Sequence, residues 1–174
     1  DLSEPVIVFS RTALAAVVVM VFINVTGGSV VGIARRVRAQ PGSAVLLGFT
    51  AIAFPFLLIT YGERTVPSGL TATLIASAPI FIAIFAPYLD RTEVMSGKQW
   101  VGLIVGLVGV SLLVGVEQVE TLGELLGAFA VIGAAASYGV SGFILKRSYP
   151  GVAPLETVLI SVGTSAIMTA PLAL

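Results

Sequence analysis

Arg11 is an ionisable residue inside a long apolar segment, where charged side chains are rare and usually functional. It lies six residues into a segment that begins near residue 5, which is about 9 Å along a helix axis. One interpretation is that Arg11 extends to the outer lipid headgroups. The other is that it faces neighbouring helices and meets an anionic group or Glu63, which ends the next apolar segment on the same side. Both interpretations remain open on the residues alone.

Two prolines interrupt successive apolar segments: Pro55 lies within residues 43–61, and Pro79 near the middle of residues 68–89. Each removes a helix hydrogen bond and favours a kink. In lipid, irregular backbone persists only where protein or a water-filled cavity shelters it. We therefore predict that Pro55, Pro79 and the nearby Ser77 line a solute pathway, with ordinary structural kinks as the alternative.

Two further positions could contact a solute. Tyr138 lies beside small residues and offers a hydroxyl and an aromatic surface, and Ser137 and Ser141 are its neighbours. Alternatively these side chains bond neighbouring helices, which is the interpretation we favour. Glu63 could act as a gate, as a partner of Arg11 or as a hydrated carboxylate at the membrane interface.

Several chemistries are excluded by composition. The chain has no cysteine and no histidine, which removes thiol nucleophiles, disulfides and the commonest metal ligand and general base. Asp90 is the only aspartate beyond Asp1, so an intramembrane aspartate pair is absent. We expect no enzyme activity, no metal site and no cofactor. The net charge is zero and no basic arm is present, so we expect no nucleic-acid partner.

The elements that position these residues are membrane helices. Hydrophobic residues make up 57% of the chain, charged residues 10%, and the mean hydropathy is +1.07. Six apolar segments each have the length of a membrane-spanning helix, which is about 20 residues. We predict an all-α, polytopic membrane helix bundle with the lipid bilayer as its surroundings. The segments are about 5–23, 43–61, 68–89, 99–116, 122–145 and 154–174.

The first connection has an alternative, in which the apolar run continues through Val30 to Ala34 and ends at Arg35. Charge placement predicts the orientation, because basic residues concentrate in cytoplasmic loops. Seven basic residues fall on the side of Arg35, and only Arg64 falls on the other. The chain starts at Asp1 without a methionine and stops within an apolar run. We therefore expect a piece of a longer protein, with an odd number of spans upstream and its own first residues outside the cell.

Small residues predict helix contacts. Gly102, Gly106 and Gly109 lie in the fourth span, and Gly123 and Gly127 begin the fifth. Spacing of four between small residues lets helix backbones approach closely in lipid. We expect packing within the bundle, with a homodimer interface as the alternative.

The residues from Tyr61 to Gly115 carry the clearest family resemblance. The segment Tyr61-Gly-Glu-Arg-Thr-Val-Pro-Ser-Gly-Leu-Thr-Ala72 resembles the Val-Pro-Ser-Gly-Leu motif that enters a helix in the EamA-like, ten-helix branch of the drug/metabolite transporter superfamily. The helix that closes the repeat shows the similar pattern Trp-x-Gly…Gly-Val. Thr92 replaces a usual glycine before Glu93. The matching positions are Pro67, Ser68, Gly69, Glu93, Trp100, Gly102 and Gly109.

The resemblance implies two inverted five-helix repeats that give alternating access to a central site. On that alignment residues 1–117 form the first repeat without its first helix, and residues 118–174 begin the second. The implied activity is export of small metabolites, such as amino acids, across a bacterial or archaeal inner membrane. A multidrug exporter of the same superfamily and a non-transporting scaffold or sensor are the alternatives. The isolated piece is not expected to transport.

Overall fold

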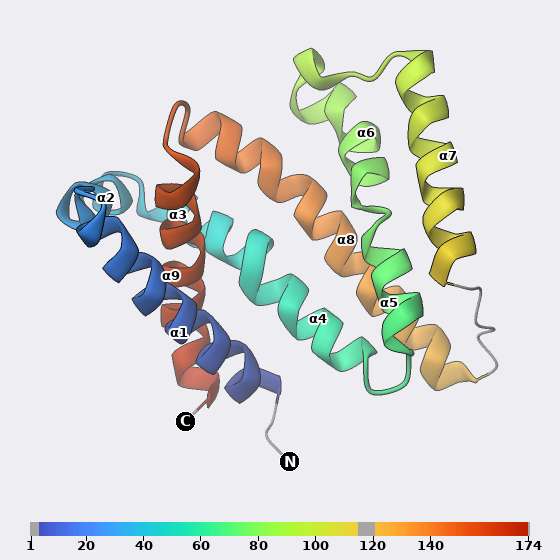
Figure 1. Cartoon of the computed structure of the whole chain (residues 1–174), viewed down its shortest axis with the longest axis horizontal. Coiled ribbons are helices and arrows are strands. Elements are labelled where there is room, and N and C mark those ends of the chain that lie inside the picture. The colour runs from blue at the N-terminus through green and yellow to red at the C-terminus, as the bar shows by residue number, and fades with distance from the viewer. Residues whose placement is uncertain (1–3, 115–120, 174) are drawn as a thin grey trace. The chain divides into compact units, whose positions relative to one another are not determined.

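The computed structural model describes residues 4–114 and 121–173, and within these ranges it contains helices and no strand (Figure 1). The all-α prediction is therefore confirmed. The predicted repeat boundary between residues 117 and 118 lies outside the described residues. The helices are α1 (Glu4–Val25), α2 (Val30–Ala39), α3 (Pro41–Gly48), the π-helix η1 (Phe49–Ala53), α4 (Phe54–Gly62), α5 (Ser68–Ile75), α6 (Ala78–Leu89), the short 3₁₀ turn η2 (Arg91–Glu93), α7 (Gly97–Val114), α8 (Leu122–Ser148) and α9 (Pro154–Ala173).

Long apolar helices agree with the predicted spans. Within the described ranges, four segments are long and apolar enough to cross a membrane: Val6–Val25, Pro41–Gly62, Ser68–Leu89 and Leu122–Ser148. The predicted fourth and sixth spans also form helices, α7 and α9. The protein is an integral membrane helix bundle.

The chain divides into two compact units. The first unit comprises Asp1–Leu57 and Ile144–Leu174, and the second comprises Leu58–Phe143. In the first unit α1 packs along α9, and α9 also packs against α3 and η1. In the second unit α5 packs against α7.

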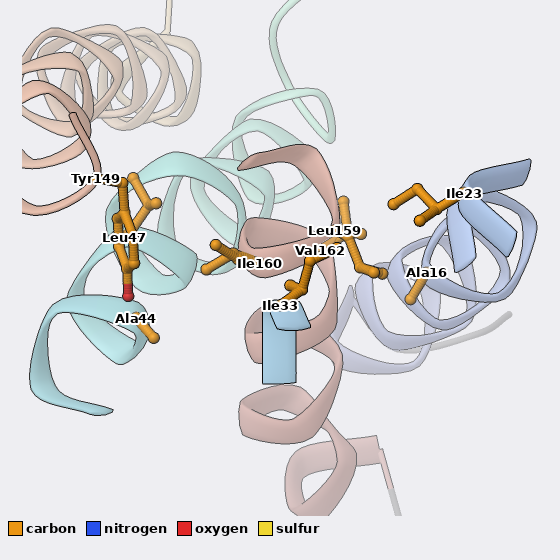
Figure 2. Close-up of a cluster of buried hydrophobic side chains, with 9 residues drawn as sticks. All are labelled: Ala16, Ile23, Ile33, Ala44, Leu47, Tyr149, Leu159, Ile160 and Val162. Carbon is orange, nitrogen blue, oxygen red and sulfur yellow. The ribbon is translucent and has the colours of Figure 1, made fainter. Parts of the chain in front are cut away.

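A cluster of buried apolar side chains holds the first unit together, and Figure 2 shows its members. Tyr149 is the polar exception. Its hydroxyl donates to the Gln40 carbonyl oxygen at 3.4 Å, and burial raises the pKa of the phenol. The cluster contains Ala16, Ile23, Ile33, Ala44, Leu47, Tyr149, Leu159, Ile160 and Val162.

Helix α2 was not predicted from the sequence. The apolar run does not continue into Ala34, because α1 ends at Val25 and a turn with Gly27 at φ +79° follows. Ser29 then caps α2 by accepting a hydrogen bond from the Gly32 amide. The alternative of a continuous first span is therefore wrong.

Glycines of the second unit behave in two ways. Gly127 lies directly against the end of α4 and the following turn, because an added Cβ would come within 2.6 Å of Thr65 Oγ1 and 3.0 Å of the Gly62 oxygen. The predicted close packing of the fifth span is confirmed there. On α7 the prediction is wrong: a Cβ added at Gly102, Gly106 or Gly109 would have no described atom within 4 Å. The alternative of a dimer interface on α7 stays a prediction.

Candidate substrate pathway

The predicted pathway residues are divided between the two units. Arg11 and Pro55 belong to the first unit, whereas Glu63, Ser77, Pro79 and Tyr138 belong to the second.

In the first unit, the backbone before Pro55 is a π-helix. Phe54 donates its N–H to the Phe49 carbonyl, five residues back, and the two rings stack at 5.1 Å between centroids. A proline cannot donate to the residue four positions earlier and its ring crowds that carbonyl. The extra residue of the π-turn relieves this conflict, and such turns are frequent at functional sites. The predicted irregularity at Pro55 is confirmed.

Arg11 lies beside this irregular turn. Its guanidinium carbon is 5.2 Å from the centre of the Phe56 ring, and its side chain is exposed. A cation over an aromatic face is held by the ring's quadrupole. Arg11 therefore has a defined partner one residue from Pro55, which the sequence analysis did not anticipate, while its exposed face remains available to an anionic group.

In the second unit, the third span is broken rather than bent. Helix α5 ends at Ile75, Ala76 and Ser77 form the break, and α6 begins at Ala78 with Pro79 in its first turn. Proline is tolerated there because the first amides of a helix have no internal acceptor. The Ser77 hydroxyl donates to the Leu74 carbonyl oxygen at 2.5 Å. The prediction of irregular backbone near Pro79 is confirmed.

A cavity of about 280 Å³ opens beside the break, lined by residues of α7 and by Ala76. Glycines create part of this space, since neither Gly102 nor Gly106 has a side chain to fill it. Broken membrane helices beside a cavity are the usual position of a transporter's substrate site. Its lining is Ala76, Gly102, Leu103, Gly106 and Leu107.

The two remaining pathway candidates differ in burial. Tyr138 is half-buried in α8, and its carbonyl oxygen accepts a hydrogen bond from the Ser141 hydroxyl at 2.8 Å. Glu63 follows the last residue of α4, and its side chain is exposed. A pathway role for either residue stays a prediction.

The family-motif positions have structural roles. Pro67 caps α5 with extended backbone, and Ser68 and Gly69 form the first turn of that helix. Thr92, which replaces the usual glycine, donates its amide and hydroxyl hydrogens to Asp90 Oδ1 at 2.9 Å and 2.7 Å. Glu93 ends this turn, and its side chain lies outside the described part of the chain. The threonine therefore stabilises the turn with side-chain bonds.

The comparisons with known proteins agree with this arrangement. The model of the EamA-like transporter family matches residues 1–115. The chain belongs to this family. It is 37% identical over 68 residues to the uncharacterized transporter YdfC of Bacillus subtilis (strain 168), covering 39% of this chain and 22% of YdfC. It is 30% identical over 93 residues to the uncharacterized transporter YoaV of the same organism, covering 53% of this chain and 32% of YoaV.

These matches cover less than two thirds of each relative's length. No solved structure matches the chain significantly. The chain thus shares its sequence family with membrane transporters and spans 22% and 32% of the length of these two relatives.

Buried hydroxyls in this EamA-like chain were missed by the sequence analysis. In α9 four buried polar residues recur at spacings of three and four, which was the available signal. Among the described residues, Ser165 Oγ in the first unit and Thr71 Oγ1 in the second are buried without a hydrogen-bond partner. Such groups are rare and need an explanation, and each could bind a polar solute or water. The α9 residues are Ser161, Thr164, Ser165 and Thr169.

Proposed function

We propose that the chain is part of a secondary transporter that exports small metabolites, such as amino acids, across the plasma (inner) membrane by alternating access. The proposal includes two inverted five-helix repeats, of which residues 1–117 and 118–174 are portions. The observation that supports it most directly is the break at Ala76–Ser77 in an otherwise membrane-spanning helix.

In lipid, a break in a span requires its backbone groups to find partners within the protein. The Ala76 and Ser77 amides still donate to the Ala72 and Leu74 carbonyl oxygens at 3.0 and 3.1 Å. The cavity of about 280 Å³ beside Ala76 places this irregular turn next to space that a solute could occupy. Small glycines on α7 keep that space open. A polar metabolite could therefore bind at the break.

Arg11 supports a substrate that carries a carboxylate. Its guanidinium rests against Phe56 beside the π-turn, and its side chain is exposed. Arginine binds carboxylates through paired hydrogen bonds. This favours metabolites such as amino acids over organic cations, for which a membrane-embedded carboxylate would be the more suitable partner.

The test is solute flux from proteoliposomes that contain the product of the complete reading frame. A panel of amino acids, other metabolites and cationic drugs is loaded inside, and efflux is measured for the parent and for Gly106→Leu. A Cβ at this position meets no described atom within 4 Å, so the leucine side chain can extend from it into the cavity. We expect metabolite efflux in the parent and its loss in Gly106→Leu.

Gly109→Leu is the matched control. Gly109 is also on α7 with open space around it, and it does not line the cavity. Its variant should therefore retain parental flux. Efflux of cationic drugs alone would favour the multidrug alternative, and absence of any flux in the parent would favour a scaffold or sensor.

A further inference from the structure

A second cavity lies in the first unit, apart from the irregular backbone described above. It has a volume of about 250 Å³ and lies between α1, α2 and α9. Its lining is almost entirely apolar, and the hydroxyl of Thr164 is already donated to the Ile160 carbonyl oxygen at 2.6 Å. We call it the α2 groove. It is lined by Met20, Val30, Ile33, Ala34, Val37, Arg38, Leu159, Ile160, Gly163, Thr164 and Ile167.

The groove continues into a cavity bordered by cationic side chains. This neighbouring space of about 380 Å³ shares Val30, Ala34 and Arg38 with the α2 groove and adds Val31 and Arg35. Residues three apart on a helix lie on the same side, about 5–6 Å apart at their Cβ atoms. Arg35 and Arg38 therefore flank the same opening, and both side chains are exposed.

Carboxylates are scarce around these arginines. The sequence has no acidic residue between Glu4 and Glu63. In the first unit the acidic residues of the described ranges are Glu4, in the first turn of α1, and Glu156, in the first turn of α9. Within those ranges neither Arg35 nor Arg38 forms an ion pair. Among the described residues of the first unit, the positive charge of Arg35 and Arg38 therefore has no carboxylate partner.

We propose that the α2 groove binds a glycerophospholipid with an anionic headgroup: Arg35 and Arg38 hold the phosphate, and one acyl chain lies along the groove. A soluble anion would gain no binding free energy from the apolar lining. An acyl chain in the groove would gain it, because the lining and the chain would both be removed from water. Basic pockets between membrane helices on the cytoplasmic side are suited to anionic headgroups. The inference concerns the lipid surroundings of the protein and does not depend on which solute is exported.

Helix α2 has the form that such binding needs. One side presents Val30, Ile33 and Val37 to the protein, with Ile33 buried. The opposite edge carries the arginines. A short helix with this division lies at the boundary between headgroups and acyl chains, which places its guanidinium groups at the depth of lipid phosphates.

The test uses tryptophan fluorescence quenched by brominated lipid acyl chains. Trp100 is the only tryptophan, so Trp100→Phe combined with Ile167→Trp places one reporter at the edge of the groove, where Ile167 is 75% exposed. Quenching by dibrominated phosphatidylglycerol and by dibrominated phosphatidylcholine is compared at equal mole fractions. Since each basic residue near the surface favours anionic lipid by about five-fold, the two arginines together should give a preference for phosphatidylglycerol of about thirty-fold.

Two sets of variants sharpen this test. Arg35→Gln with Arg38→Gln should reduce the preference to about equal binding, whereas Arg36→Gln should preserve it, because Arg36 lines a different cavity with Gln40 and Tyr149. Gly163→Leu should weaken quenching by both lipids, since its side chain would extend into the groove from a Cβ that meets no described atom within 4 Å. Gly142→Leu is the control, because a Cβ there also meets no described atom within 4 Å, and it should leave quenching by both lipids unchanged. Circular dichroism checks that each variant is folded.

Three results would overturn the proposal. Equal quenching by the two lipids, or a preference that survives the double arginine substitution, would remove the headgroup site. Displacement of the preference by soluble glycerol 3-phosphate would show that a free phosphate compound suffices. Absence of quenching by either lipid would show that a protein segment covers the groove.

Discussion

Glycines on α8 and on α7 follow similar spacings but have opposite surroundings. Gly127 and Gly139 on α8 lie at close approaches to other helices or turns, where an added Cβ would come within 2.6 Å of Thr65 Oγ1 and 3.0 Å of Phe81 Cβ. At Gly102 and Gly106 on α7, which line a cavity, an added Cβ would meet no described atom of another segment within 4 Å. Small residues thus serve close packing on one helix and leave space on the other.

The difference shows why spacing alone does not assign a role. A small-residue pattern permits close approach but does not require it. The partner surface decides: α8 meets Thr65 and Val66 at Gly127, whereas α7 runs beside a helix that ends at Ile75. The following substitutions test this contrast, beginning with the largest expected effect.

Gly127→Val should be the most damaging change. Its side chain would press on Thr65, on Val66 and on the backbone oxygen of Gly62, and overpacking of this kind costs about 1–3 kcal/mol or more. We expect a loss near the top of that range in the free energy of unfolding, measured by titration from mild detergent into SDS. Wild-type stability in this variant would contradict the close packing of α8 against the end of α4.

Gly139→Ala should have an intermediate effect. The new methyl group would lie 3.0 Å from Phe81 Cβ and 3.2 Å from the Ile82 amide nitrogen of α6. Because only one methyl group must be accommodated, we expect a loss of about 1 kcal/mol in the same titration. An increase in stability would mean that α6 and α8 are farther apart than described.

Gly106→Ala should change stability in the opposite direction. An alanine methyl group meets no described atom within 4 Å there, and alanine is better than glycine in a helix interior by about 0.5–1 kcal/mol. We expect a small gain in the free energy of unfolding. A loss comparable to that of Gly139→Ala would show that α7 packs closely at this position.

Thr65→Val should produce the smallest effect. The Thr65 hydroxyl donates to the Gly123 carbonyl oxygen at 3.0 Å, joining the turn after α4 to α8. Side-chain hydrogen bonds between membrane helices contribute about 0.6 kcal/mol on average. The variant should lose about that amount, and a change as large as that of Gly127→Val would show that this bond is the principal contact between the two segments.

The membrane helices could be predicted from the sequence, because an apolar segment of about 20 residues is a strong indication of a membrane-spanning helix. The broken backbone at Pro79 and the irregular turn at Pro55 were predicted from proline chemistry. Helix α2 was not predicted, because its three arginines make the segment resemble a polar loop. Its apolar residues Val30, Ile33 and Val37 nevertheless recur at helical spacing after the N-cap residue Ser29.

The candidate site was less accessible to sequence reasoning. The proximity of Arg11 to Phe56 is a contact between residues 45 positions apart within the first unit, which no local pattern specifies. The cavity beside Ala76 likewise depends on the glycines of α7, which have no side chain to fill it. A glycine in the sequence does not indicate whether a neighbouring helix packs against it or a cavity remains there.

The central claim is that the break at Ala76–Ser77 borders a water-accessible pathway. Ser77→Cys, Gly106→Cys and Val108→Cys each introduce a single thiol into residues 1–174, which contain no cysteine. Any cysteine elsewhere in the complete reading frame is first replaced by serine. The reaction rates of these three variants with a charged, water-soluble thiosulfonate are measured in membrane vesicles containing the complete reading frame. The account predicts fast labelling at positions 77 and 106, and slow labelling at position 108, where the valine is 52% exposed on α7 outside the cavity lining. Equally slow labelling at all three positions would contradict it.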